Sequence, residues 1–100
     1  MAFDDLNPLL HSQLRLAIMS LLISVKEADY KYIKEETRAS SGNISVQMSK
    51  LEDAGYVEVT KTFKDNKPNT SYTITPEGIE AFETYVNTLQ QYLDVNSNDN

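Results

Sequence analysis

The side chains with the most evident chemistry lie between Ser41 and Lys50, where hydroxyl and amide groups dominate. An amide side chain can pair with adenine through two hydrogen bonds, and a small apolar group can contact the methyl group of thymine. The candidate residues for contacts to bases or adjacent phosphates are Ser41, Asn43, Ser45, Val46, Gln47 and Lys50. The alternative is a polar, solvated surface, because polar helix faces are the default on a soluble domain.

A helix over about residues 41–54 would position these groups. Ile44, Met48 and Leu51 recur at the spacing of one face of a helix with 3.6 residues per turn. The candidate groups then lie on or beside the opposite face. Either Ser40 or Ser41 can cap the helix start, and Gly55 can adopt the left-handed conformation that ends a helix.

Three lysines follow in a stretch with a different period. Residues 56–63 are rich in β-branched and aromatic side chains in an alternating pattern, which predicts a strand. Residues 64–69 read as a turn and residues 70–75 as the returning strand, so the pair forms a β-hairpin. Lys61, Lys64 and Lys67 lie on or near its tip, where we expect contacts to phosphates or to the minor groove. The alternative is that these lysines protect an exposed edge strand from pairing.

The chain before this region predicts two helices. Asn7-Pro8 is typical of a helix start, with apolar residues at helical spacing as far as Val25. Asp29 is a plausible cap for a short second helix over about 30–37, and residues 27–29 can form a short strand. Residues 38–41 are then the turn of a helix-turn-helix. From the residues alone, the expected role of Arg15 is a surface ion pair, with Asp4 or Asp5 as its partner.

The last predicted helix begins at Thr75-Pro76, with threonine as the cap and proline at the first helical position. Its apolar residues follow a spacing of 3, 4, 3 and 4, which resembles a short heptad seam. They are Ile79, Phe82, Val86, Leu89 and Leu93. The first helix also has a wider apolar stripe than a small core requires. We therefore expect a homodimer built from both helices, with Leu10, Leu14, Val86, Leu89 and Leu93 as dimerisation candidates.

Several of these blocks together resemble a known family. The run from Ser41 to Val57 reads Ser-Gly-Asn-Ile-Ser-x-x-Met-x-Lys-Leu-Glu-x-Ala-Gly-Tyr-Val, and Lys-Thr-Phe, Pro-Asn-Thr-Ser-Tyr and Thr-Pro-Glu-Gly follow in order. Over roughly residues 7–93 the chain is similar to small, single-domain MarR-like winged-helix transcriptional regulators. The resemblance implies an α+β, mostly helical fold: a winged helix-turn-helix with a two-stranded β-hairpin wing and a long C-terminal helix. It also suggests a phosphate or inter-subunit contact for Arg15.

Such regulators place the recognition helix, here about 41–54, in the major groove of double-stranded DNA and the wing, about 61–70, on the backbone or minor groove. The net charge of −6 argues against nucleic acid, but the charge is unevenly distributed. Residues 38–72 carry five basic and four acidic side chains, whereas residues 73–100 carry five acidic and no basic ones. A local patch can therefore still attract DNA. The alternative function is a winged-helix module for protein–protein interaction, with little or no DNA binding.

Other functions find little support in the composition. The 100 residues contain no cysteine and one histidine, and no glycine-rich phosphate loop is present. We therefore expect no enzyme activity, no catalytic or metal-ligating residues and no cofactor. We expect one domain over residues 1–94, a disordered tail over 95–100, no membrane span and a cytoplasmic location. An unknown effector would find room only at the dimer interface.

Overall fold

The computed structural model describes residues 3–94 and contains four α-helices and three β-strands within that range. Along the chain they are α1 (Gln13–Val25), β1 (Glu27–Asp29), α2 (Tyr30–Thr37), α3 (Ser41–Asp53), β2 (Val57–Lys64), β3 (Lys67–Ile74) and α4 (Pro76–Leu93). This order confirms the predicted winged helix-turn-helix with a long last helix. The tail predicted over residues 95–100 lies outside the described residues.

The core lies between α1, α2, α3 and the base of the sheet. Each helix contributes the apolar side chains that its 3.6-residue period brings to one face. The fully buried ones are Ile18, Met19, Leu22, Ile33, Ile44 and Leu51, and the chain before α1 adds Leu10. In α3 the inward residues are Ile44, Met48 and Leu51, as predicted, so the opposite face of this helix is left to solvent.

The helix boundaries follow from side-chain caps that satisfy the unpaired amides of each first turn. Ser40, rather than Ser41, caps α3, because its Oγ accepts a hydrogen bond of 3.2 Å from the amide of Asn43. Asp29 caps α2 in the same way, accepting from Tyr32 at 2.8 Å. After α3 the chain reverses at Gly55, whose φ of 80° is the left-handed value predicted for this glycine.

The start of α1 differs from the sequence prediction. Residues around Asn7-Pro8 form a turn, in which the Asn7 Oδ1 accepts from the amide of Leu9 at 2.9 Å. Helix α1 begins only at Gln13, with Ser12 as its cap. An asparagine side chain that bonds the backbone two residues ahead stabilises a turn in place of a helix. This turn directs Leu10 into the core, where its side chain is fully buried.

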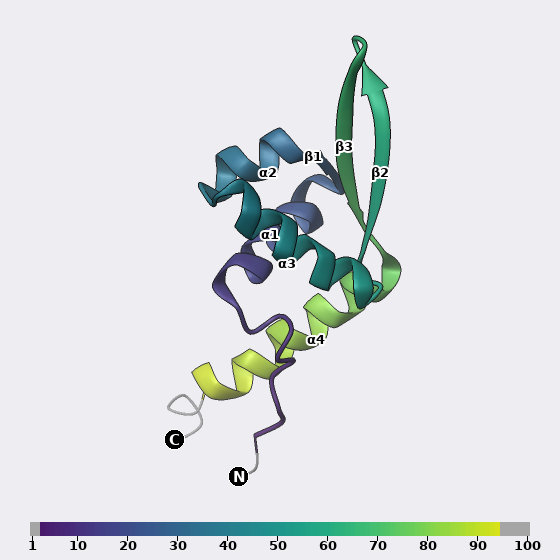
Figure 1. The fold of residues 1–100 in the computed structure, drawn as a ribbon. Helices are drawn as coiled ribbons and strands as arrows, with labels where there is room; N and C mark the ends of the chain where they lie inside the picture. Colours follow the sequence, from purple (N-terminus) through teal and green to yellow (C-terminus); the bar gives the residue numbers. More distant parts are fainter. Residues whose placement is uncertain (1–2, 95–100) are drawn as a thin grey trace.

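The three strands form an antiparallel sheet in the order β1-β3-β2. Strand β1 confirms the short strand predicted over residues 27–29. The hairpin β2–β3 is paired from Val57 with Ile74 to Lys64 with Lys67, so the predicted turn over residues 64–69 is too long. Two residues make the turn, Asp65 and Asn66, both with positive φ, a conformation that matches the twist of a hairpin. Figure 1 shows the hairpin extending far beyond the helices.

Helix α4 runs along the other end of the molecule, and the N-terminal segment lies beside its C-terminal half (Figure 1). The Phe3 ring stacks on Tyr92 with ring centroids 4.7 Å apart, and the Tyr92 hydroxyl donates to the Asp4 carbonyl at 2.8 Å. Tyr85 and Thr88 face the chain's own interior and are buried. None of the helices within residues 3–94 has the length and apolarity that crossing a membrane requires.

Candidate nucleic-acid interface

The outer face of α3 presents the predicted polar groups. Ser41, Asn43, Ser45, Val46 and Lys50 are exposed, and Gln47 is half-buried. Val46 keeps 53% of its surface exposed although it is apolar. This face therefore combines hydroxyl, amide and small apolar groups, the set that can contact base edges in a groove.

Three of these side chains already have partners within the chain. The Ser41 Oγ accepts a hydrogen bond of 3.2 Å from Lys34 Nζ on α2. The Gln47 Oε1 accepts one from Arg15 on α1, and the Gln47 Nε2 donates to the Asn43 Oδ1 at 3.0 Å. Lys34 was not singled out from the sequence, and it brings a positive charge to the start of α3.

Arg15 has neither Asp4 nor Asp5 as a hydrogen-bond partner, in contrast to the first of its two predicted roles. Its Nε donates to the Leu9 carbonyl at 2.5 Å, and its terminal nitrogen donates to Gln47. Asp4 instead accepts from the Gln91 side chain at 2.9 Å. The Asn7 turn explains this arrangement, because it brings the Leu9 carbonyl back over the first turn of α1.

The hairpin register separates the three predicted lysines of the wing. Neighbouring side chains of a strand point to opposite faces. Lys61 therefore shares a face with the buried Val57, whereas Lys64 lies on the other face with its partner Lys67. Lys64 and Lys67 stand directly opposite each other next to the turn, and like charges in such a pair repel. An anion beside the tip would relieve this repulsion.

A groove of about 340 Å³ lies between α3 and the wing. Helix α3 contributes Ser45 and Ser49, and the wing contributes Lys61 and Tyr72. Burial raises the pKa of the Tyr72 phenol, with further contributions from Tyr30 and the carboxylate of Glu52. The phenol is therefore held neutral, and Lys61 supplies the positive charge on the wing side of this groove.

Sequence reasoning missed Phe63, which is 78% exposed and lies near the tip of the wing. It is paired with Pro68 on the face that also carries Lys61. The alternation along β2 could have indicated it. Every second residue from Val57 lies on the face that begins in the core, and Phe63 is the member of this set that lies farthest from α3. Aromatic and proline side chains in such positions are used by proteins that contact the minor groove.

The predicted dimerisation residues are distributed between the surface and the interior. Leu10 is fully buried within its own chain and has no surface to offer a partner. Leu14 and Leu89 are half-buried. Val86 and Leu93 are 38% and 64% exposed on α4. Together with Ile79, also 38% exposed, they leave an apolar stripe on the side of α4 that faces away from the core.

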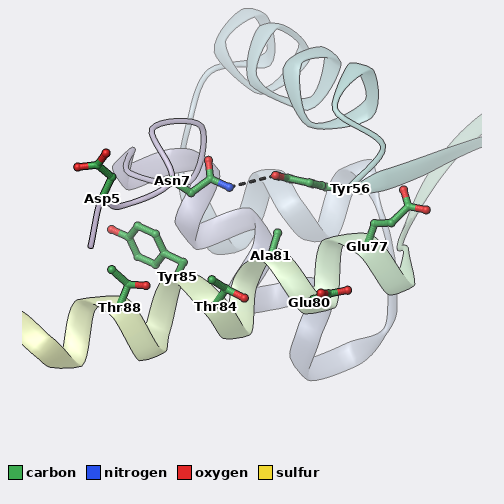
Figure 2. A pocket seen from close by; sticks show the side chains of 9 residues that line it. All are labelled: Asp5, Asn7, Tyr56, Glu77, Glu80, Ala81, Thr84, Tyr85 and Thr88. Carbon is green, nitrogen blue, oxygen red and sulfur yellow. Dashed lines mark hydrogen bonds between the residues drawn. The ribbon is translucent and has the colours of Figure 1, made fainter. Parts of the chain in front are cut away.

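A separate cleft of about 450 Å³ lies between α4 and the N-terminal segment (Figure 2). The Asn7 Nδ2 donates across its edge to the Tyr56 hydroxyl at 3.0 Å. Asp5, Glu77 and Glu80 contribute three carboxylates to its lining, and none of the DNA-binding candidates lines it. An anionic lining repels phosphate, so this cleft is unsuited to nucleic acid.

The helix-turn-helix, the exposed face of α3 and the projecting hairpin define a winged-helix domain of the kind that binds DNA. The family model described as a winged helix DNA-binding domain matches residues 14–93, and the chain belongs to this family. The resemblance to small winged-helix transcriptional regulators that the sequence predicted is thereby confirmed.

The chain is also similar to individual proteins and solved structures. An uncharacterized protein from Methanocaldococcus jannaschii is 31% identical over 81 residues, which cover 81% of this chain and 88% of that protein. The structure of a transcriptional regulator homologue from Pyrococcus horikoshii superposes with a TM-score of 0.81 at 28% identity, covering 86% of this chain and 85% of that chain. The PcaV transcriptional regulator from Streptomyces coelicolor gives a TM-score of 0.72 at 15% identity, covering 84% of this chain and 61% of that chain. At that identity, the likeness shows the fold alone.

Proposed function

We propose that the protein is a homodimeric transcriptional regulator that binds double-stranded DNA at a specific sequence. The observation that carries this proposal is the outer face of α3, where exposed amide and hydroxyl groups stand beside a wing that carries lysines at its tip. Asn43, Ser45 and Val46 would contact base edges in the major groove. Lys50, at the far end of the same face, would contact a base or a neighbouring phosphate.

In the proposed complex the wing contacts the backbone or the minor groove next to α3. Lys64 and Lys67 face each other at the tip, and a phosphate placed between them would neutralise their repulsion. Lys61 lies closer to α3, on the side of the groove between the helix and the wing. The wing therefore supplies affinity for phosphate, and α3 supplies the preference between sequences.

The homodimer rests on the apolar stripe of α4. Val86 and Leu93 are exposed on this stripe, and Leu89 lies partly buried between them. A second copy of α4 would cover the stripe through the same residues, as a two-fold interface requires. Two recognition helices then read two half-sites about 10 bp apart, so the target is a pseudo-palindrome. If an effector regulates the protein, we expect it to bind at this interface.

A protein–protein interaction module is the second candidate. The net charge of −6 favours it, as does the presence of only one cation, Lys50, among the outward candidates of α3. Salt discriminates between the two functions, because DNA binding through phosphates weakens steeply as ionic strength rises. Binding through the apolar surface of a partner protein does not show this dependence.

Fluorescence anisotropy with labelled duplexes tests the proposal. The duplexes are a random-sequence pool and a site selected from that pool with the wild-type protein. The decisive variant is Lys64→Ala/Lys67→Ala, which lowers the net charge by two at the wing tip. The matched control is Thr84→Glu/Asn87→Glu, which lowers the net charge equally at exposed positions of α4.

We expect steep weakening of wild-type binding between ~50 and ~200 mM salt, and a shallower dependence of the affinity on salt for the wing variant. The wing variant should lose affinity equally for the pool and the selected site, whereas the control should keep the wild-type salt dependence. Absence of binding at ~50 mM salt would reject the proposal and favour the protein-binding alternative. Equal losses in the two double variants would show that only net charge matters and would reject the wing contact.

A further inference from the structure

A chain of hydrogen bonds connects the turn before α1 to the exposed face of α3. The Leu9 carbonyl accepts from Arg15 Nε at 2.5 Å, and Arg15 donates from its terminal nitrogen to the Gln47 Oε1. Gln47 then donates from Nε2 to the Asn43 Oδ1 at 3.0 Å. We call these four groups the Arg15 relay. It ends on Asn43, which is exposed on the face proposed to contact bases.

The chemistry of arginine fixes the direction of every bond in this relay. A guanidinium group has five N–H donors and no acceptor, so the atom of Gln47 that faces it is the oxygen. The nitrogen of the same amide then faces Asn43, and it requires an acceptor there, which is Oδ1. The amide of Asn43 is therefore turned so that its Nδ2 is left over. In the part of the chain that the structure describes, this nitrogen has no hydrogen-bond partner, and the Asn43 side chain is exposed.

Arg15 is itself held on two sides. Its Nε and its terminal nitrogen belong to one rigid plane, and they bond the Leu9 carbonyl and Gln47 respectively. Its side chain is partly buried. A group that is fixed in this way before binding loses little conformational freedom when a ligand arrives. The relay thus orients Asn43 in advance of any contact with DNA.

We propose that Arg15 is a positioning residue for base recognition, and that it makes the Nδ2 donor of Asn43 the group that is presented to the major groove. This inference rests on the proposed function. Among the base edges there, guanine offers two acceptors, N7 and O6, whereas cytosine offers a donor. Asn43 therefore selects guanine foremost and rejects cytosine at the position it contacts. In this proposal Gln47 does not pair with adenine through two bonds, because its Oε1 is bonded to Arg15 and its Nε2 to Asn43.

The competing role for Arg15 is a phosphate contact, which the same positive charge would also provide. Arg15→Lys separates the two roles, because lysine keeps the charge but cannot bond the Leu9 carbonyl and Gln47 in one rigid plane. A phosphate contact would survive this substitution with the salt dependence of binding unchanged. The relay would not survive it, and the preference for one base would fall.

The experiment begins with a site selected by the wild-type protein and with duplexes that carry each of the four bases at each position. Wild type, Arg15→Lys, Arg15→Ala and Asn43→Ala are compared by competition anisotropy. We expect both Arg15 variants to lose roughly fivefold or more of the discrimination between guanine and cytosine, at the position where Asn43→Ala loses it. Arg15→Lys should keep the wild-type slope of affinity against salt.

Gln47→Glu gives a sharper result because it reverses the direction of the hydrogen bond between residues 47 and 43. Its carboxylate still accepts from Arg15, but its second oxygen then faces Asn43 and requires a donor. The amide of Asn43 must reverse and present its oxygen to the groove. We expect the preference at this one position to shift from guanine toward cytosine, which offers a donor. An unchanged preference for guanine in this variant would overturn the proposal.

A measurement without DNA tests the relay separately from the function. In nuclear magnetic resonance spectra the side-chain NH₂ group of Asn43 should be ordered in wild type and become mobile in Arg15→Ala, while the backbone amide spectrum of the core is preserved. An Asn43 side chain that is equally mobile in both proteins would overturn the relay. A wild-type protein that selects no site would reject the proposed function together with the base-reading role. A selected site whose preference survives Arg15→Lys would reject the inference alone.

Discussion

Gly78 marks the closest approach between α4 and the rest of the chain. A Cβ atom placed on Gly78 would lie 2.2 Å from the Tyr56 carbonyl oxygen and 2.9 Å from the Ile74 Cγ1. The first of these contacts involves backbone, which cannot rotate away. The cap of α4 lies beside it, because the amide of Gly78 donates to the Thr75 Oγ1 at 3.0 Å. We therefore predict that Gly78→Ala displaces the start of α4 and destabilises the fold.

The magnitude follows from three contributions. Forcing a methyl group into a packed site costs typically 1–3 kcal/mol, and loss of a helix cap costs about 1 kcal/mol. Replacing a helical glycine by alanine stabilises the helix by up to about 1 kcal/mol, because alanine has the higher helix propensity. The net expectation is a decrease of about 1–3 kcal/mol in the free energy of unfolding.

Gly42→Ala is the matched control, because the same substitution there meets no atom within 4 Å. This glycine lies in the first turn of α3 and is exposed, so helix propensity dominates and we expect a gain of about 0.5 kcal/mol. Urea denaturation followed by circular dichroism, at one fixed protein concentration, measures both variants. A Gly78→Ala protein as stable as wild type, beside a stabilised Gly42→Ala protein, would refute the steric argument.

Three further predictions concern the dimer, the wing and the response to alkaline pH. Leu93→Glu should convert the proposed dimer to monomer in sedimentation equilibrium, whereas Asn87→Glu, with the same added charge beside the stripe on α4, should leave it dimeric. Phe63→Ala should change the free energy of unfolding by less than about 0.5 kcal/mol, because the ring is exposed, and should weaken DNA binding without changing its salt dependence. Since burial raises the pKa of Tyr72 above its ordinary value of 10.0, its contribution to stability is complete below that pH. It is lost as the pH rises through the range between that value and the raised pKa, so Tyr72→Phe should show a shallower alkaline decline in urea denaturation.

The elements that sequence reasoning predicted well are those whose signals are local. In α3 the cap, the apolar period and the terminal glycine all lie within residues 40–55, and each acts on its immediate neighbours. The same holds for the caps of α2 and α4, Asp29 and Thr75. The class of fold followed because these local signals occur in the order of a winged helix.

The predictions that differed from the structure depended on competition between two local options. Asn7 can cap a helix or bond its own backbone in a turn, and it does the latter, so α1 begins six residues after Asn7, at Gln13. The sequence predicts a long wing turn because residues 64–69 are polar apart from Pro68, and proline and asparagine are typical of turns. Asp65 and Asn66 both tolerate positive φ and close the turn in two residues. In each case the side chain permitted both structures, and the period of the neighbouring residues did not distinguish them.

The Arg15 relay could not be predicted, because it joins residues that are 32 positions apart in the sequence. Residue type suggested that Gln47 reads a base directly, and only the packing of α1 against α3 shows that its oxygen is occupied. Contacts of this kind depend on the relative placement of two helices. No periodicity or spacing within either helix records them.

The distribution of charge explains why contacts to bases would matter more in this protein than contacts to phosphates. The carboxylates of Asp5, Glu77 and Glu80 gather along α4 and the N-terminal segment, whereas Lys64 and Lys67 lie at the tip of the wing. A duplex that approaches with its phosphates toward the wing meets attraction, and one that approaches α4 meets repulsion. Because few phosphates can be neutralised, the sequence-independent part of the affinity is small. In the proposed complex, specific binding must then depend more on contacts to base edges, and the donor that we propose Arg15 orients would make those contacts selective without adding positive charge.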